Sequence, residues 1–209
     1  MKIHPTAIIE GDVSIGDGTE IGAFCYIRGP AIIGKNNRIN PHCVIGTEPE
    51  SRGAIPTGSI FIGENNIITE FTVIQRGTGD KETTVGNNNF FMHNTHIAHD
   101  CIVGDNVTIA PNVVLAGHTH IHNGATIGIG TSIHQFSTIG AYAMVGMNCT
   151  VTKDIPPFAL VVGSPAVFKR YNTYQIKKLG IEDLLNSALY TEHYSRFILT
   201  SRREVLDVT

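Results

Sequence analysis

An aliphatic side chain returns at every sixth residue along most of this chain, and this period restricts the possible fold more than any other feature. The first run consists of Ile3, Ile9, Ile15, Ile21, Ile27, Ile33, Ile39 and Ile45. Two further runs extend from Ile62 to Ile74 and from Val85 to Val151. A hexapeptide period is typical of a parallel β-helix, in which short strands separated by corners stack coil upon coil around a shared aliphatic core. We therefore predict a mainly β solenoid.

The residues between the aliphatic positions favour tight corners, which agrees with this prediction. Glycine often follows the aliphatic residue, with asparagine or aspartate soon after it, as in IGKNN, IGENN, VGNNN and VGDNV. Glycine and asparagine tolerate the positive φ angles that such corners require. Three hexapeptides make one triangular coil, so residues 18 apart should stack at roughly the 4.8 Å spacing of neighbouring strands.

The six-residue period is interrupted at residues 51–61 (SRGAIPTGSIF) and again at residues 80–84 (DKETT). These additional residues must leave the coil as loops. Because binding and catalytic residues are often carried by loops on a rigid scaffold, we expect the two insertions to border a functional cleft.

The period ends near residue 157, which divides the chain into a β-helix of residues 1–157 and a C-terminal extension of residues 158–209. From about Tyr174 the apolar spacing becomes helical. A second helix is predicted to carry Tyr194, Phe197, Ile198 and Leu206. Such helices would cover the unpaired strand edges of the last coil.

Charge and hydropathy exclude several classes of function. The formal net charge is −3 and the chain has no run of Lys and Arg, so it lacks the basic surface expected of a nucleic-acid-binding protein. No stretch approaches the ~18 apolar residues that a membrane span requires, and the N-terminus lacks a basic segment followed by an apolar run. We expect a cytoplasmic protein with no nucleic-acid partner and no membrane span.

The four cysteines share one position in the repeat, four residues after an aliphatic position. They are Cys25, Cys43, Cys101 and Cys149. Small residues fill the same position elsewhere, so we expect these thiols to face the core as small hydrophobic groups. No two of them form a CxxC pair, and a cytoplasmic chain keeps its thiols reduced, so neither a zinc ribbon nor a disulfide framework is predicted.

The histidines behave differently, because the 18-residue spacing brings three of them to one corner. Ile97, Leu115 and Ile133 begin hexapeptides on three successive coils. The three histidines that follow them are His99, His118 and His134. A corner is exposed to solvent, so this arrangement favours a functional site over packing in the core.

Two kinds of chemistry remain open for this corner, metal ligation and acid/base catalysis. A catalytic zinc usually takes three protein ligands, which neighbouring subunits of a β-helix can supply. However, the alternation of His118, His120 and His122 does not match the histidine spacing of the γ-class carbonic anhydrases. His99 is followed by Asp100, which can orient the imidazole or stabilise its charged form. We therefore favour His99 as a general base and predict no metal site.

Several motifs, in order and nearly without gaps, resemble those of the UDP-N-acetylglucosamine acyltransferases of lipid A assembly. They are FMHNTHIAHDCIVGDN, LAGH, SIHQF, MVG and KDIPPF, and the resemblance extends from HPTAIIE to about Pro157. It implies a left-handed parallel β-helix that forms a homotrimer with active sites between subunits. It also implies transfer of a 3-hydroxyacyl group from acyl carrier protein to the 3-position of a UDP-amino sugar, without a cofactor.

The same resemblance assigns roles to individual residues. His99 would be the general base supported by Asp100, and Gly117 would present its backbone N–H to the developing oxyanion. Contacts with the acyl acceptor would come from His96, His118, His134 and Gln135, and, in the C-terminal segment, from Asn172 and Lys178.

Three departures from the family pattern leave the substrate open. The segment GTEPESRGAIPT lacks the family's sugar-binding stretch and offers Arg52 as a nearby cation. Met147 follows MVG, where a thioether would shorten the accepted acyl chain by filling the end of its channel. The segment VVGSPAVFK resembles the CoA-dependent hexapeptide acetyltransferases. An acyl-CoA-dependent N-acyltransferase acting on a nucleotide-linked amino sugar for surface glycans is therefore the alternative, and a non-catalytic β-helix module is a third possibility.

Overall fold

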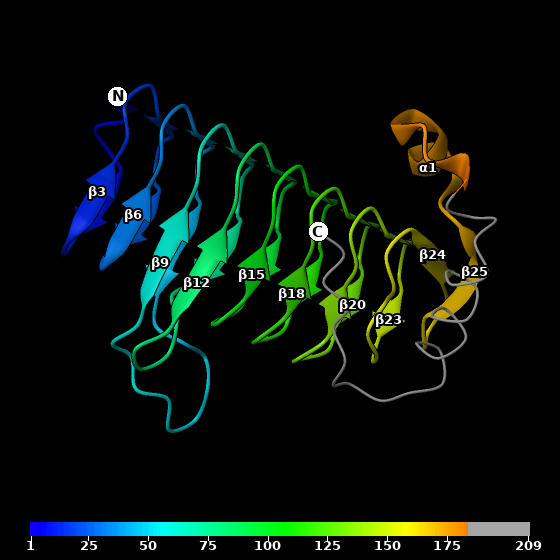
Figure 1. Cartoon of the computed structure of the whole chain (residues 1–209). Helices are drawn as coiled ribbons and strands as arrows, with labels where there is room; N and C mark the ends of the chain where they lie inside the picture. The colour runs from blue at the N-terminus through cyan, green and yellow to red at the C-terminus, as the bar shows by residue number, and fades with distance from the viewer. Residues whose placement is uncertain (184–209) are drawn as a thin grey trace.

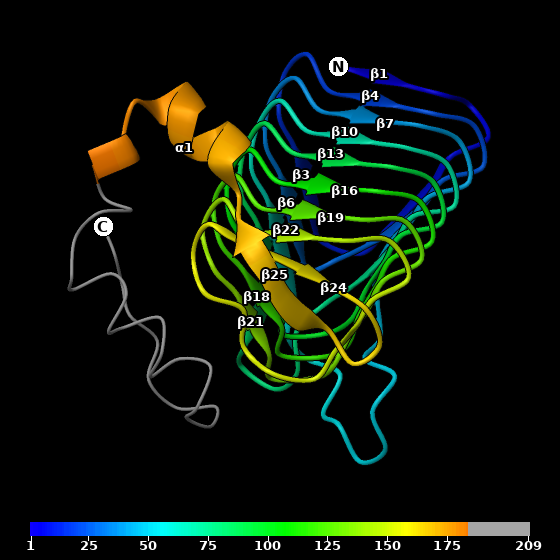
Figure 2. The same ribbon diagram turned by 90° about the vertical axis from the view of Figure 1, so that its right-hand side faces the viewer.

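The computed structural model describes residues 1–183, which form a triangular parallel β-helix followed by a β-hairpin and a short helix (Figure 1). The chain winds through three sheets in turn, so that each sheet forms one side of the triangle (Figure 2). This architecture confirms the mainly β solenoid predicted from the hexapeptide period, and it agrees with the left-handed β-helix that the resemblance implies.

The strands of each sheet are hydrogen-bonded in the following orders. The first sheet contains β1 (Lys2–Ile3), β4 (Glu20–Ile21), β7 (Arg38–Ile39), β10 (Ile67–Ile68), β13 (Phe90–Phe91), β16 (Thr108–Ile109), β19 (Thr126–Ile127), β22 (Met144–Val145), β24 (Ala159–Val162) and β25 (Val167–Tyr171). The second contains β2 (Ile8–Glu10), β5 (Tyr26–Arg28), β8 (Val44–Thr47), β11 (Val73–Gln75), β14 (His96–Ile97), β17 (Val114–Leu115), β20 (Ser132–Ile133) and β23 (Thr150–Val151). The third contains β3 (Val13–Ile15), β6 (Ala31–Ile33), β9 (Ser59–Ile62), β12 (Glu82–Val85), β15 (Ile102–Val103), β18 (His120–Ile121) and β21 (Thr138–Ile139).

The strand register confirms the predicted spacing of 18 residues. Ile97 of β14 pairs with Leu115 of β17, and Leu115 pairs with Ile133 of β20. Where the insertions occur, the step lengthens: Ile39 pairs with Ile68, and Ile68 pairs with Phe91. The coils thus keep their stacking although the number of residues between them changes.

The aliphatic positions of the repeat form the core. From Ile21 to Val151, every residue at this position is at most 2% exposed. In the first coil Ile9 is 36% exposed, because no earlier coil covers it. The four cysteines are buried in the same core, as predicted, and burial raises the pKa of the Cys101 thiol to about 12. A thiol with this pKa is protonated at neutral pH, which argues against Cys101 as a nucleophile.

Both insertions leave the β-helix at the same corner, between the second and third sheets, and they lie side by side (Figure 1). The loops span residues 48–58 and 76–81, slightly earlier than the sequence placed them. The difference arises because the last residues of each predicted insertion extend the strands β9 and β12, which pair along their whole length. The Gly79 amide donates to the Ile55 carbonyl at 2.8 Å, which ties one loop to the other.

The C-terminal end of the β-helix carries a hairpin and a helix. Strand β25 pairs antiparallel with β24, an arrangement that the period did not predict. The first part of the helix predicted from Tyr174 is present as α1 (Thr173–Leu179), which buries Ile176 and ends at Gly180 with a left-handed φ of 65°. The residues expected to continue it, Leu184 to Leu189, lie outside the described residues. The predicted second helix lies outside the described residues. Within residues 1–183, no helix is long and apolar enough to cross a membrane.

Neighbouring isoleucines of β6 allow a direct test of the core. Ile33 is 1% exposed and Ile32 is 52% exposed on the opposite face of the same strand. We expect Ile33→Ala to lower the free energy of unfolding by about 2–5 kcal/mol, because it leaves a cavity between stacked coils. Ile32→Ala, the matched control, should change it by less than about 1 kcal/mol. Chemical denaturation measures both, and equal effects would contradict the inward assignment of the six-residue period.

Candidate active site

The candidate site lies at the corner between the second and third sheets, on two successive coils. His99 and Asp100 follow β14. Gly117 and His118 follow β17, the paired strand of the next coil, at nearly the equivalent position. Asp100 and His118 both adopt positive φ, of 59° and 61°, as do residues at the corners of many other coils. This shared backbone conformation places the two side chains one above the other.

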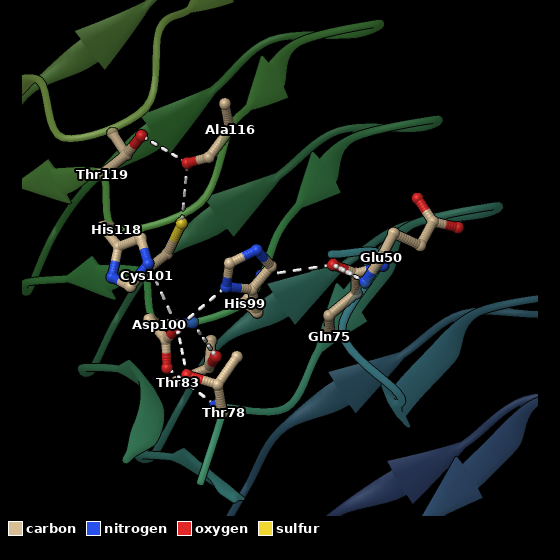
Figure 3. Close-up of polar contacts among 10 residues, drawn as sticks. All are labelled: Glu50, Gln75, Thr78, Thr83, His99, Asp100, Cys101, Ala116, His118 and Thr119. Atoms are coloured by element: carbon tan, nitrogen blue, oxygen red, sulfur yellow. Dashed lines mark hydrogen bonds and ion pairs between the residues drawn. The ribbon is translucent and has the colours of Figure 1, made fainter. Parts of the chain in front are cut away.

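The carboxylate of Asp100 is the centre of the site (Figure 3). Its Oδ2 lies 2.8 Å from His99 Nδ1 and 3.4 Å from His118 Nε2. Thr78 donates twice to the same carboxylate, from its amide to Oδ1 at 2.8 Å and from its hydroxyl to Oδ2 at 2.9 Å. The Asp100 side chain is only 3% exposed, so these donors replace its hydration.

These contacts set the charge of Asp100. Burial alone would raise the pKa of the carboxyl, but the hydrogen bonds from the Thr78 amide, from His99 and from the Thr78 hydroxyl outweigh burial and lower the pKa below its ordinary value. Asp100 is therefore ionised at neutral pH and accepts a hydrogen bond from His99 Nδ1. The tautomer assigned from this hydrogen bond leaves His99 Nε2 with a free lone pair, as a general base requires.

His118 is the second imidazole that reaches Asp100, and it is held by aromatic packing. Its ring meets the His99 ring edge-on, with centroids 5.2 Å apart. It stacks on Phe136 of the following coil, with centroids 4.4 Å apart and an interplanar angle of 8°. Burial lowers the pKa of His118, and Lys81 and His99 add to this effect against the opposing charge of Asp100. His118 is therefore neutral at neutral pH.

Gly117 lies directly beneath the imidazole of His99. A Cβ atom at this position would stand 2.7 Å from His99 Cε1 and 2.8 Å from Nε2, so a larger residue would displace the ring. Gly117 is buried, and among the hydrogen bonds of residues 1–183 its amide donates to none. The site thus combines a free imidazole nitrogen with a backbone donor close by.

Gln75 connects His99 to the first loop. Its side chain is 1% exposed, and its Oε1 accepts hydrogen bonds from the amides of His99 at 3.2 Å and Glu50 at 3.4 Å. The backbone of Asp100 is held in a similar way, since its amide donates to Thr83 Oγ1 at 2.9 Å. The corner that carries His99 and Asp100 is therefore fixed by side chains of the preceding coil.

The two loops and the histidine pair enclose an open pocket of about 370 Å³. His99 and His118 line the pocket from the β-helix, and Arg52 and Lys81 contribute one cation from each loop. Arg52 was predicted from the sequence to be near the site, whereas Lys81 was not. Asp80 also lines the pocket, so the two cations exceed the acidic side chains of its lining by one, and the pocket is suited to an anionic ligand held beside the His99 imidazole.

The other predicted acceptor-binding residues of the β-helix lie near the site but outside the hydrogen-bonded cluster. His96 is half-buried on β14, where burial lowers its pKa and the charge of Glu50 opposes this shift. His134 and Gln135 are exposed one coil beyond His118, and His134 Nδ1 lies 3.0 Å from the Gln135 carbonyl oxygen. The predicted trio of histidines is thus a contacting pair with a third histidine on the next coil.

Three predicted residues lie toward the C-terminal end of the β-helix. Asn172 is 7% exposed and donates to the Tyr142 carbonyl at 2.9 Å, so its side chain supports the end of the solenoid. Lys178 lies on the last turn of α1. Met147 follows β22 at a different corner and is 68% exposed. None of the three lines the pocket at His99.

Several residues important to this geometry were missed by the sequence analysis. They are Gln75, Thr78, Thr83, Lys81 and Phe136. For the first four, the available signal was the position of the run QRGTGDKETT, which begins the second interruption of the period, and Phe136 ends the motif SIHQF. Nothing in the run itself indicates which side chains turn toward Asp100.

The cluster also meets the minimum geometry for a metal, because ligand atoms of His99, Asp100 and His118 lie within 4.8 Å of one another. However, the 2.8 Å contact between His99 Nδ1 and Asp100 Oδ2 has the length of a charge-assisted hydrogen bond. Both carboxylate oxygens also accept hydrogen bonds from Thr78. The donor set therefore favours proton transfer over metal ligation.

Comparison with known proteins agrees with the sequence pattern. The family described as bacterial transferase hexapeptide (six repeats) matches residues 12–47, 82–117 and 118–153. Two curated acyl-[acyl-carrier-protein]–UDP-N-acetylglucosamine O-acyltransferases are similar. The protein of Gloeothece citriformis is 42% identical over 75% of this chain and 58% of its own length. That of Aliarcobacter butzleri is 41% identical over 85% of this chain and 76% of its own length. The chain thus spans 58% and 76% of the lengths of these two relatives.

Solved structures of two UDP-N-acetylglucosamine acyltransferases share the fold. The enzyme of Francisella novicida superposes with a TM-score of 0.78 at 36% identity, over 86% of this chain and 69% of its own. The enzyme of Campylobacter jejuni superposes with a TM-score of 0.79 at 32% identity, over 88% of this chain and 81% of its own.

The ionised state of Asp100 predicts a specific pH dependence of stability. The pKa of Asp100 is lower in the folded chain than in the unfolded chain, so the folded state binds fewer protons. The stability that Asp100 contributes is therefore fully present above its unfolded pKa of about 3.9. It is lost as the pH falls through the folded pKa. The stability difference between wild type and Asp100→Asn should therefore shrink as the pH falls below about 5 and continue to shrink until the pH has passed the folded pKa. Urea unfolding midpoints measure it, with exposed Asp17→Asn as control. A difference that is constant with pH would contradict the assignment.

Proposed function

This chain belongs to the family of acyl-[acyl-carrier-protein]–UDP-N-acetylglucosamine O-acyltransferases, and on that premise we propose that it transfers a 3-hydroxyacyl group from acyl carrier protein to the 3-position of a UDP-amino sugar such as UDP-N-acetylglucosamine. The observation that carries the proposal is the pair formed by His99 and ionised Asp100, with a free imidazole nitrogen beside Gly117 and the pocket. The resulting product is an early intermediate of lipid A biosynthesis.

His99 Nε2 removes the proton of the sugar 3-hydroxyl as the oxygen attacks the thioester carbonyl. The imidazolium that forms is stabilised by Asp100, whose Oδ2 holds Nδ1 at 2.8 Å. When the tetrahedral intermediate collapses, the carbon–sulfur bond breaks and His99 returns the proton to the carrier-protein thiolate. The thioester is already activated, so the reaction needs neither a covalent enzyme intermediate nor a metal or other cofactor.

Gly117 supplies the electrophilic part of this mechanism. Its backbone N–H donates to the carbonyl oxygen as negative charge develops there, and one such donor is commonly worth about 3 kcal/mol of barrier. The absence of a side chain also leaves room for the His99 imidazole, whose Nε2 would lie 2.8 Å from a Cβ atom.

The acceptor is recognised by charge and by the remaining histidines. Arg52 and Lys81 attract the diphosphate of the nucleotide sugar to the mouth of the pocket. The sugar and phosphate contacts are completed by His96, His118, His134 and Gln135. In a homotrimer, a neighbouring copy would present its C-terminal segment, with Lys178 and the backbone at Asn172, to the nucleotide; neither residue lines the pocket of its own chain. We place this reaction in the cytoplasm.

The decisive test is the reaction itself. Purified protein is incubated with 3-hydroxyacyl carrier protein and UDP-N-acetylglucosamine, and the released thiol and the acylated sugar are measured. We expect turnover with this pair, and His99→Ala should reduce it at least about 100-fold. Exposed His4→Ala, with an unchanged rate, is the matched control.

Three outcomes would contradict parts of this assignment. Turnover only with acyl-CoA and a 3-amino acceptor would support the N-acyltransferase alternative. An unchanged rate in His99→Ala would remove His99 as the base. If no donor is consumed with any UDP-amino sugar, the enzymatic function is wrong and the β-helix serves as a non-catalytic module.

Met147 gives a prediction about acyl length. We expect Met147→Gly to shift the preference toward longer chains, because the thioether no longer fills the end of the acyl channel. Burial of two further methylenes is worth about 1.6 kcal/mol, so kcat/KM for a donor two carbons longer should rise by at least about tenfold. Competition between donors of different length measures the shift, with Met144→Ala on β22 as control. An unchanged length profile would show that Met147 does not contact the acyl chain.

A further inference from the structure

We propose that Thr78 is the positioning residue of the acid/base pair: it fixes the Asp100 carboxylate so that the carboxylate fixes the His99 imidazole. The inference rests on the proposed function in one respect: the pair that Thr78 positions, His99 and Asp100, is the catalytic pair of the proposed acyl transfer. Thr78 lies in the loop of residues 76–81, 22 residues before Asp100, and reaches it from the preceding coil (Figure 3).

Thr78 is the one residue among those described that holds both oxygens of the Asp100 side chain. Its amide donates to Oδ1 at 2.8 Å and its hydroxyl donates to Oδ2 at 2.9 Å. Two donors from one residue, one on each oxygen, prevent rotation of the carboxylate about its Cβ–Cγ bond. Oδ2 is thereby directed at His99 Nδ1, which donates to it at 2.8 Å.

The backbone around Thr78 is itself held in place. The Gly77 amide donates to the Ser59 carbonyl at 2.9 Å, and the Gly79 amide donates to the Ile55 carbonyl at 2.8 Å. Thr78 is therefore flanked on both sides by hydrogen bonds to the segment that forms the first loop and β9. A residue anchored in this way can orient a partner, because it does not move to accommodate that partner.

The Thr78 hydroxyl has a role separate from that of the Thr78 amide. Substitution by valine retains the side-chain shape and the amide donor but removes the donor to Oδ2. Oδ2 then accepts from His99 and His118 alone, at 2.8 and 3.4 Å, and the carboxylate, held only by the Thr78 amide at Oδ1, can swing Oδ2 between these two imidazoles. The His99 proton loses its fixed acceptor, so Nε2 is unprotonated for a smaller fraction of the time.

The test combines a spectroscopic and a kinetic measurement on the full-length protein. Nitrogen-15 NMR of the His99 ring at neutral pH should show a protonated Nδ1 and an unprotonated Nε2 in the wild type. In Thr78→Val both signals should move toward averaged values, and kcat should fall about tenfold with KM for the sugar changed less than about threefold. Thr78→Ser, which retains the hydroxyl, should restore both.

Thr57 provides the matched control. Its hydroxyl donates to the Gly79 carbonyl at 2.8 Å, a loop hydrogen bond of similar length that does not touch Asp100. Thr57→Val should therefore leave the His99 ring signals and kcat at wild-type values. Should Thr78→Val fail to give a cooperative thermal transition, Thr78→Ala removes the same hydroxyl with less steric demand and is compared in the same way.

The outcomes separate this inference from the proposed function. Wild-type ring signals in Thr78→Val would overturn the positioning role, whether or not kcat falls. Failure of Thr78→Ser to restore the signals would overturn it as well. Altered ring signals in Thr78→Val, combined with no acyl transfer by any variant or by the wild type, would support the positioning role of Thr78 while refuting the proposed function.

Discussion

The stacking of each coil on the previous one, through parallel strand pairing, is the constraint on which the rest of the structure depends. Strands of two to five residues would not be stable alone; they persist because each pairs with equivalent strands above and below and buries an aliphatic residue between them. Pairing across the insertions, as between Ile68 and Phe91, keeps the register in every coil. Additional residues can therefore leave the solenoid only at a corner.

This constraint also explains where the site forms. Consecutive coils expose equivalent corner residues one above another, so Asp100, His118 and Phe136 follow one another along the axis with nearly the same positive φ. Elsewhere asparagine often occupies such positions, as at Asn94 and Asn112, whose side chains hydrogen-bond to each other at 2.8 Å. Replacing that polar ladder by a carboxylate, an imidazole and an aromatic ring converts a structural corner into a chemical one.

The two loops have a double function at this corner. They border the pocket with Arg52 and Lys81, and through Thr78 they also hold the Asp100 carboxylate. In the proposed reaction, substrate recognition and orientation of the base would therefore share one structural unit. Such an arrangement reduces the reorganisation needed when a substrate binds, because the donors are already directed at the carboxylate.

The sequence by itself determined the solenoid, its inward-facing residues and the positions of His99 and His118 along the axis, because a strict six-residue period converts sequence separation into position. The inward phase of Cys101 was predictable for the same reason, and the contact of His99 with Asp100 was predictable because the two residues are neighbours in the sequence. Only the tertiary structure decided that Thr78 and Gln75 hold the pair, that Lys81 joins Arg52 at the pocket, and that Phe136 rather than His134 packs on His118. These residues lie in the loops, or their side chains point away from the coil. At such places the six-residue period does not fix the direction of a side chain, and contacts between distant segments decide its conformation.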